Sequence, residues 1–526
     1  MPLPTSPVYL DQLRLSLLHL RSTLGADALD AHADTLQLFA WLDLEPARPI
    51  LQACYATHPR GGEPWDPIIV LRCLLVMLQV GQPSINRWVD QVRATPALRV
   101  ACGFDLTGVT PGVGTLYDFL NRLHDGPRRP VPGQALPERP SHTERRRAQA
   151  PVPPGTKPQK KEEVKTNETL TARIVKELEA AKDQKRGVDL LQRLADILLH
   201  VAVRPSAERG LLGEPDTIVA HGDGSALMTG ADPHGQKICE HDRFTRCTCP
   251  RIWTDPDAAW GYVASLDRYF YGHHFYEISV SHRGHNLPLA LRLDPGNASD
   301  FAQSLWTLDA MQKQWQEAEL DWKLGVFIAD AGHDAEPIYR YLNDRGITPV
   351  IPLRDQGPAR HADRPELTLS PRGVPMCEAG VEMTPWGTAG SNHVPSFICP
   401  FKAGKLTCCP KAPESDPEWS CRPGTKYAPV VTVPSADNPR IFPPLPRNHP
   451  RWAEYMALRS GCERSNSIKK NGLKLEQAGH RRASFWLIRL HLCAVLQHAR
   501  AWVASASKLA KSWLRVFLET GQVLTV

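Results

Sequence analysis

The feature that most constrains the fold is a change of hydrophobic period near residue 216. Before this point, apolar residues recur at helical spacing. After it come three apolar runs that are typical of strands, at 217–223, 269–281 and 286–294. A helical segment, a strand, a second helix and a further strand follow, up to residue 354. Three leading strands followed by this alternation predict an α/β fold with a mixed sheet covered by helices.

The segments around this core differ in composition. The N-terminal part reads as helices, with starts at Ser84 and at Thr95-Pro96. The next 40 residues hold nine prolines and ten Lys/Arg. They contain too few apolar residues to bury a core. Residues 355–450 are rich in proline and cysteine, and a connection this long predicts a separately packed insertion. The predicted division is 1–125 (helical domain, either a DNA-end-binding module or a scaffold), 126–165 (flexible basic linker), 166–354 (first part of the core), 355–450 (insertion domain) and 451–526 (a long helix and C-terminal helices).

Positive charge is concentrated in two segments. The whole chain carries +6, whereas residues 126–165 carry ten Lys/Arg against four Asp/Glu, and residues 451–526 carry thirteen against four. The remainder is therefore acidic, with a net charge of −9. Two basic segments around an acidic body indicate a polyanionic partner and a separate acidic, metal-binding site. The alternative is a solvated linker and a solvated helix face.

The sequence favours a cytoplasmic protein without a membrane partner. Its most apolar run, Ile68 to Val80, is 13 residues long and contains Arg72, whereas a membrane-spanning helix needs about 20 apolar residues. The first residues have neither the basic start nor the apolar stretch of a secretory signal. The 13 cysteines, an odd number in a large chain, favour buried thiols in a reducing compartment.

Three acidic residues stand out by their positions. Asp223 follows the first predicted strand, Asp330 follows the fourth, and Glu463 lies on the helix after the insertion. Functional groups of layered α/β sheets collect where strands end, so the helix can bring the third acid over the first two. Each acid also has an ordinary alternative, namely a turn aspartate, a helix cap, and an ion pair with Arg459.

Three carboxylates in one pocket repel each other unless cations neutralise them. Mg²⁺ prefers hard oxygen ligands and keeps substrate phosphates in its coordination shell. Two such ions about 3.5–4 Å apart can activate a nucleophile and stabilise the leaving oxygen of a phosphodiester. The three acids therefore predict a site for two Mg²⁺ ions, for which Mn²⁺ can substitute. Arg459, Glu463 and Lys470 fall within about 60° of one helix face, where the two cations can hold phosphates.

Together these motifs resemble the DDE transposases of bacterial insertion sequences. Residues 65–92 resemble the family's N-terminal domain, 221–227 its first-aspartate strand, 294–300 the turn before its helix, and 329–335 its second-aspartate motif, with His333 replacing the usual tyrosine. Arg459, Glu463 and Lys470 match the spacing of the family's tyrosine–arginine–glutamate–lysine signature. Tyr455 falls one residue further from the arginine than usual.

The resemblance implies an RNase H-like mixed sheet with flanking helices and a transposase that cleaves and joins insertion-sequence DNA ends. It implies that Asp223, Asp330 and Glu463 are catalytic and bind the metal ions. It also implies DNA contacts from Tyr455, Arg459, Arg464 and Lys470. The implied partners are terminal inverted repeats, target DNA and a second copy in a homodimer or higher assembly, at the bacterial nucleoid. Two alternatives stay open: an RNase H-like nuclease without strand transfer, and a catalytically lapsed DNA-binding protein.

Two further groups of residues carry weaker expectations. Cys239, His241, Cys247 and Cys249 offer four zinc ligands, but their spacing departs from the usual separation of two to four residues. Ordinary buried thiols are therefore favoured over a structural Zn²⁺ ion. For Trp386 and Trp419 in the insertion, core packing is favoured over stacking on a flipped base.

Overall fold

A computed structural model of the chain provides the coordinates. The structure describes residues 6–25, 27–55, 63–126, 147–148, 168–242, 245, 247, 249, 251–354, 360–361, 364–389, 394–414, 429–433, 438–506 and 513–521.

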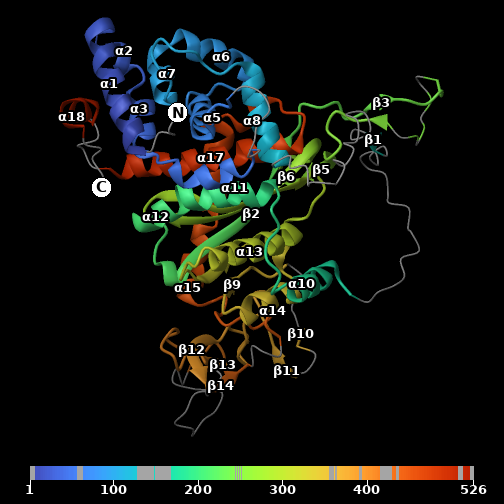
Figure 1. Cartoon of the computed structure of the whole chain (residues 1–526). Coiled ribbons are helices and arrows are strands. Elements are labelled where there is room, and N and C mark those ends of the chain that lie inside the picture. Colours follow the sequence, from blue (N-terminus) through green and yellow to red (C-terminus); the bar gives the residue numbers. More distant parts are fainter. Residues whose placement is uncertain are drawn as a thin grey trace.

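A six-stranded mixed sheet lies at the centre of the molecule (Figure 1). Strand β2 is central: it pairs antiparallel with β6 and parallel with β8, and β9 continues the sheet parallel to β8. The edge of β6 that faces away from β2 pairs with both β5 and β7. This arrangement confirms the predicted mixed sheet and is consistent with an RNase H-like fold. The strands are β2 (Ile218–Met228), β5 (Ala259–Val263), β6 (Arg268–His282), β7 (His285–Pro295), β8 (Leu324–Ile328) and β9 (Thr348–Val350).

Helices cover both faces of this sheet. Helix α13 (Asp300–Glu317) packs on β6 and β7, with α10 (Leu170–Ala180) and α14 (Glu336–Asp344) beside it. On the opposite face, α16 (Ser460–Ser467) crosses β2 and β6, and α17 (Ala483–Ser505) lies along β7. The two predicted helices of the core, α13 and α14, are thus confirmed.

The N-terminal part is helical, as its periodicity predicts. The Ser84 Oγ accepts a hydrogen bond from the Arg87 N–H at the start of α6, and α7 begins at Pro96. The predicted apolar face of α8 is buried at Leu116, Phe119 and two further leucines. The helices are α1 (Ser6–Leu24), α2 (Asp27–Asp30), α3 (Ala33–Trp41), α4 (Arg48–Gln52), α5 (Pro67–Gln79), α6 (Ile85–Ala94), α7 (Pro96–Cys102) and α8 (Val113–Asp125).

These N-terminal helices share one hydrophobic core with the sheet. Helix α17 joins them, because it packs on α3 and α5 as well as on β7 and α11 (Leu190–Leu198). The remaining helices around this core are α12 (Arg204–Glu208) and α18 (Trp513–Thr520), of which α18 packs on α1 and α3. No helix among the described residues is both long enough and apolar enough to traverse a bilayer.

The insertion has a small hydrophobic cluster of its own, which includes Leu369, Phe397 and Phe442. A buried and a partly buried contact attach it to the core: Arg447 donates to the Tyr339 hydroxyl over 2.8 Å, and Arg440 pairs with Asp334 over 2.7 Å. Its strands are β10 (Arg360–His361), β11 (Arg364–Thr368), β12 (Thr384–Ala389), β13 (Val394–Ile398) and β14 (Val430–Thr432).

Trp386 on β12 is 61% exposed, so the expectation that it packs in a core is wrong. The reason is that β12 and β13 pair at the periphery of this small insertion, which leaves the large ring without a layer to cover it. Trp419 lies outside the described residues.

A short arm of two-residue strands extends from the β5–β6 side of the sheet (Figure 1). It contains β3 (Gln236–Lys237), β4 (Arg251–Ile252) and β1 (Arg147–Ala148), in the order β1-β4-β3. Strand β1 and Gly126 are the only described parts of the predicted basic linker, and the rest of that segment lies outside the described residues.

Candidate active site

Asp223 lies in the middle of β2, between two glycines. A Cβ on Gly224 would overlap the carboxylate of Asp300, and one on Gly222 would overlap the Tyr276 hydroxyl. The Gly-Asp-Gly sequence is therefore required by the close packing of β2 against α13 and β6. Burial, reinforced by the neighbouring Asp300 and Asp330, raises the pKa of Asp223 to about 7, although the Arg459 guanidinium opposes this shift.

Asp330 follows β8, the parallel neighbour of β2, and caps the short 3-10 helix η5 (Ala331–His333). Its Oδ1 accepts hydrogen bonds from the Gly332 N–H over 2.9 Å and from Nδ1 of His333 over 2.7 Å. These bonds favour the ionised form, so the pKa of Asp330 lies below its usual value, with the His333 bond as the largest cause.

His333 fixes the orientation of Asp330. Its ring is fully buried, and its Nε2 lies 3.1 Å from the hydroxyl of Tyr276 on β6. Because the Nδ1 N–H donates to the carboxylate, Nε2 is free to accept from the tyrosine. The histidine that replaces the family's usual tyrosine therefore connects Asp330 to the buried side of the sheet.

Glu463 lies on α16, the second part of a helical segment that is less regular than predicted. The expected long helix is divided into α15 (Pro450–Leu458), α16 and the π-helical turn η6 (Ile468–Gly472). The Glu463 side chain is 62% exposed, and its Oε1 pairs with Nη2 of Arg459 over 3.5 Å. Next to it, the buried Cys462 Sγ lies 2.7 Å from His221 Nδ1 and so holds α16 against β2.

Arg459 connects the three acids. It pairs directly with Glu463, and its positive charge opposes the rise in the pKa of Asp223 and adds to the lowering of the pKa of Asp330. Arg459 therefore pairs with one of the three acids and lies near enough to the other two for its charge to act on them. The oxygens of the three acids are not packed as closely as the ligands of a single small ion. In the described chain, only one His/Cys/Asp/Glu group has all its ligand atoms within 4.8 Å of one another, and it does not include these acids.

The residues expected to contact DNA have different environments. Arg464 is exposed and donates to Ser460 Oγ over 2.7 Å. Lys470 is partly exposed, pairs with Glu476 over 3.1 Å and donates to the carbonyl of Ala226 on β2. Tyr455 instead packs beside the apolar cluster on β8 and β9.

Asp300 is a site residue that the sequence did not single out. Its Oδ1 is buried and has no hydrogen-bond partner among the described residues, and it lies 3.4 Å from Nδ1 of His274. Its charge raises the pKa of Asp223. In the sequence it is an acid in the first turn of a helix, a common helix-dipole arrangement, so no signal separated it from ordinary helix starts.

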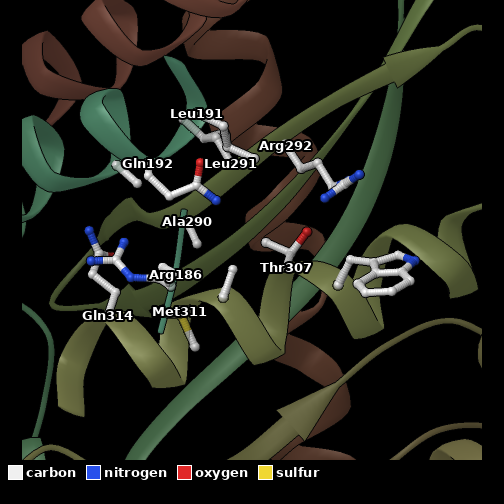
Figure 2. A pocket seen from close by; sticks show the side chains of 12 residues that line it. Arg186, Leu191, Gln192, Ala290, Leu291, Arg292, Thr307, Met311 and Gln314 are labelled. Carbon is white, nitrogen blue, oxygen red and sulfur yellow. The ribbon is translucent and has the colours of Figure 1, made fainter. Parts of the chain in front are cut away.

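The pocket in Figure 2 is not part of this site. It lies between α11, α13 and β7, and none of Asp223, Asp330 and Glu463 lines it. The lining residues are Arg186, Leu191, Gln192, Ala195, Ala290, Leu291, Arg292, Trp306, Thr307, Ala310, Met311 and Gln314.

Comparison with known families gives two matches. Residues 231–375 match the family "Transposase DDE domain", and residues 27–122 match "Transposase domain (DUF772)". The first match includes Asp300 and Asp330 and ends before Glu463. No curated protein and no solved structure matches the chain. The two matched domains, in this order, support a DDE transposase of the insertion-sequence type, and both indicate a function in DNA transposition.

Proposed function

We propose that Asp223, Asp330 and Glu463 hold divalent metal ions, and that this site cleaves DNA at transposon ends and joins the freed 3′ end to target DNA. The observation that carries the proposal is that acids from β2, from the end of β8 and from α16 all interact with Arg459, Glu463 as an ion pair over 3.5 Å and Asp223 and Asp330 through its charge.

The residues present fit hard divalent ions such as Mg²⁺ or Mn²⁺. All candidate ligands are carboxylate oxygens, and Asp300 adds a buried oxygen without a hydrogen-bond partner in the described chain. Burial, together with the charges of Asp300 and Asp330, raises the pKa of Asp223, and a bound cation would favour its ionised form. Because the three acids do not form a group with all ligand atoms within 4.8 Å in the described chain, we place two ions between them rather than one.

When bound, the ions would activate the attacking oxygen and stabilise the leaving oxygen of the phosphodiester. The protein's own contribution is orientation and charge. His333 and the Gly332 N–H hold the Asp330 carboxylate in one direction. When DNA binds, the Arg459 guanidinium leaves the carboxylates and binds a phosphate of the DNA strand. Its planar fork of N–H donors is well suited to phosphate oxygens.

Double-stranded DNA is the substrate that these groups fit. Arg464 and Lys470 lie on the same helical segment as Glu463 and provide phosphate contacts beside the acids. Residues 451–526 carry thirteen Lys/Arg against four Asp/Glu, in keeping with a salt-sensitive contact to the phosphate backbone. Because terminal inverted repeats occur as two copies, we expect two or more copies of the chain to act together.

The test is Asp330→Asn in the full-length chain, with Glu336→Gln as the matched control. Asparagine keeps an Oδ1 acceptor for Gly332 and His333 but removes the charge. Glu336 is a nearby exposed acid that pairs with Arg340 on the surface. We expect Mg²⁺-dependent cleavage of end DNA to fall by more than about 100-fold, since even second-shell changes at metal sites cost 10–100-fold. Binding of end DNA should persist.

The outcomes separate the competing functions. Cleavage by Asp330→Asn at the control's rate would refute the assignment of the site. A wild-type protein that cleaves but does not join a pre-cut end to target DNA would be a nuclease without strand transfer. A wild-type protein that binds the ends and does neither reaction would be a lapsed transposase.

A further inference from the structure

The arm between β2 and β5 brings three thiols and an imidazole together. The Sγ atoms of Cys239, Cys247 and Cys249 and a ring nitrogen of His241 all lie within 4.8 Å of one another. The Sγ atoms of Cys239 and Cys247 are 3.6 Å apart, and Cys249 Sγ is 3.5 Å from His241 Nδ1. This group is separate from the three acids, which belong to other elements.

The strand register explains why four residues with unusual spacing converge. In the antiparallel pair of β3 and β4, Lys237 lies opposite Arg251. This pairing brings the two ends of the connecting loop together, and the chain bends at Cys239, Glu240 and His241. The Cys-x-His and Cys-x-Cys pairs near these two ends thereby meet, although neither has the separation of two to four residues that most zinc sites use.

The distances match a tetrahedron around one ion. With Zn–S bonds of about 2.3 Å and Zn–N bonds of about 2.0–2.1 Å, tetrahedral angles put two sulfurs about 3.8 Å apart and a sulfur and a nitrogen about 3.5 Å apart. The two observed separations are 3.6 and 3.5 Å. A disulfide requires sulfurs about 2.05 Å apart, and these cysteines are free thiols.

We propose that Cys239, His241, Cys247 and Cys249 bind one structural Zn²⁺ ion. Four protein ligands fill a tetrahedral shell, which is the mark of a structural rather than a catalytic zinc site. Three thiolates and one Zn²⁺ leave a charge of about −1, and the Lys237 ammonium, which donates to the Asp242 carbonyl over 2.8 Å, brings a positive charge to the same loop. Sulfur ligands select zinc over Mg²⁺, so this site does not compete with the carboxylates for the same ion.

The ion would stabilise an arm that its own strands cannot. β3, β4 and β1 have two residues each, well below the length that gives an independently stable sheet. The zinc closes the loop between β3 and β4 and so fixes β4, on whose other edge β1 pairs. Because β1 belongs to the basic segment that follows the N-terminal helices, we infer that the zinc site provides the place where this segment docks.

The experiment measures metal content and coordination in the full-length protein, purified under reducing conditions. We expect about one zinc per chain by elemental analysis, resistant to Mg²⁺ exchange. Replacement by Co²⁺ should give the visible absorption of a tetrahedral thiolate site together with thiolate-to-cobalt charge transfer. This measurement needs no variant, so it remains decisive if a variant fails to fold.

Variants then identify the ligands. Cys247→Ser combined with Cys249→Ser should lose the zinc, whereas Cys408→Ser, at an exposed cysteine of the insertion, and Asp330→Asn should each keep about one zinc per chain. A wild-type chain without zinc and without the cobalt spectrum would overturn the proposal. So would zinc retained by the double cysteine variant, zinc lost by Cys408→Ser, or a Cys239–Cys247 disulfide. None of these readouts depends on DNA cleavage.

Discussion

Asp223 and Asp330 lie on neighbouring elements, yet their surroundings shift their pKa values in opposite directions. Burial and the charges of Asp300 and Asp330 raise the pKa of Asp223, whereas the His333 hydrogen bond lowers that of Asp330. Without a metal ion, the site therefore holds a proton on Asp223 up to about neutral pH and keeps Asp330 ionised. Separation of this kind between two like groups is typical of sites in which they have different roles.

A consequence for stability follows from the raised pKa. Asp223 titrates near 7 in the folded chain and near 3.8 when exposed, so only the folded state binds the proton between these values. Folding stability due to this residue is therefore present at low pH and is lost as the pH rises from about 4 to about 7. Asp223→Asn should stabilise the metal-free protein at about pH 8, by at most about 4 kcal/mol, and leave it unchanged at about pH 4.

Thermal unfolding in the presence of a chelator measures this effect. Asp300→Asn provides a second arm, because removal of its charge should lower the pKa of Asp223 and recover part of the same stability. Equal unfolding temperatures for wild type and Asp223→Asn at high pH would mean that the carboxylate is not desolvated as described.

The three acids could be found in the sequence because each lies in or directly after an element whose type is clear from its pattern, although β2 continues past Asp223 instead of ending there as expected. Asp300 could not be found, because its role depends on how tightly Gly224 lets α13 approach β2. His333 was recognised as a departure from the family's motif, but its bridge to Tyr276 depends on a strand 57 residues earlier in the chain. Residue types and local spacing do not encode contacts of this range.

At the scale of elements, a buried ion pair holds the glutamate helix on the sheet. Glu277 of β6 and Lys469 of η6 are both fully buried and paired with each other. Ser465 of α16 donates to Glu277 and accepts from Lys469 over 2.9 Å. Glu277 is the register partner of Asp223, so this contact fixes the height of α16 directly beside the candidate site.

Removal of one partner leaves an uncompensated buried charge. Lys469→Met should therefore destabilise the protein by about 3–5 kcal/mol, whereas combining it with Glu277→Gln should cost less than Lys469→Met alone. Lys470→Met is the matched control, since Lys470 is partly exposed and pairs with Glu476 at the surface. Urea unfolding of the three variants measures the difference. If Lys469→Met unfolds at the wild-type midpoint, the pair does not anchor the helix.

The sequence pattern predicted the elements of the core better than their interruptions. The strands β2, β6, β7, β8 and β9 and the helices α13 and α14 follow from apolar period and turn residues. The segment around Glu463 has continuous helical periodicity, so nothing local indicated the break at Arg459 or the π-helical turn at Ile468–Gly472. Both arise where the helix must satisfy the buried contacts of Cys462 and Lys469.

Across the whole molecule, α17 makes one hydrophobic core out of the N-terminal helices and the sheet. Its middle is buried on nearly every side, which explains why its sequence lacks a clear polar face. The buried helix also contains His491 and His498, two histidines that a composition argument would place at the surface. Their burial depends on the packing of segments hundreds of residues apart, such as the 2.7 Å bond between His498 Nδ1 and Ser206 Oγ.

Three buried histidines and the partly buried His480 make the fold sensitive to acid. Burial lowers the pKa of His221, His491 and His498 to about 4 and that of His480 to about 3. In the unfolded chain they titrate near 6.5, so below that pH the unfolded state binds more protons than the folded state. Stability is therefore present above about pH 6.5 and is lost as the pH falls toward 4, by at most about 1.4 kcal/mol per pH unit for each histidine. The contribution of Asp223 to folding stability changes in the opposite direction between about pH 4 and about pH 7. It therefore offsets the effect of about one of the four histidines.

We therefore expect the denaturation midpoint to fall clearly between about pH 7 and about pH 5, as the histidine effect outweighs that of Asp223. His491→Phe should reduce this dependence, since it removes one titrating ring whose Nε2 has no hydrogen-bond partner in the described chain. His19→Gln, at an exposed position of α1, should leave the dependence unchanged. A midpoint that stays constant or rises over this range would show that the rings are already charged, or already solvated, in the folded protein. The shared core around α17 would then be more open than its packing indicates.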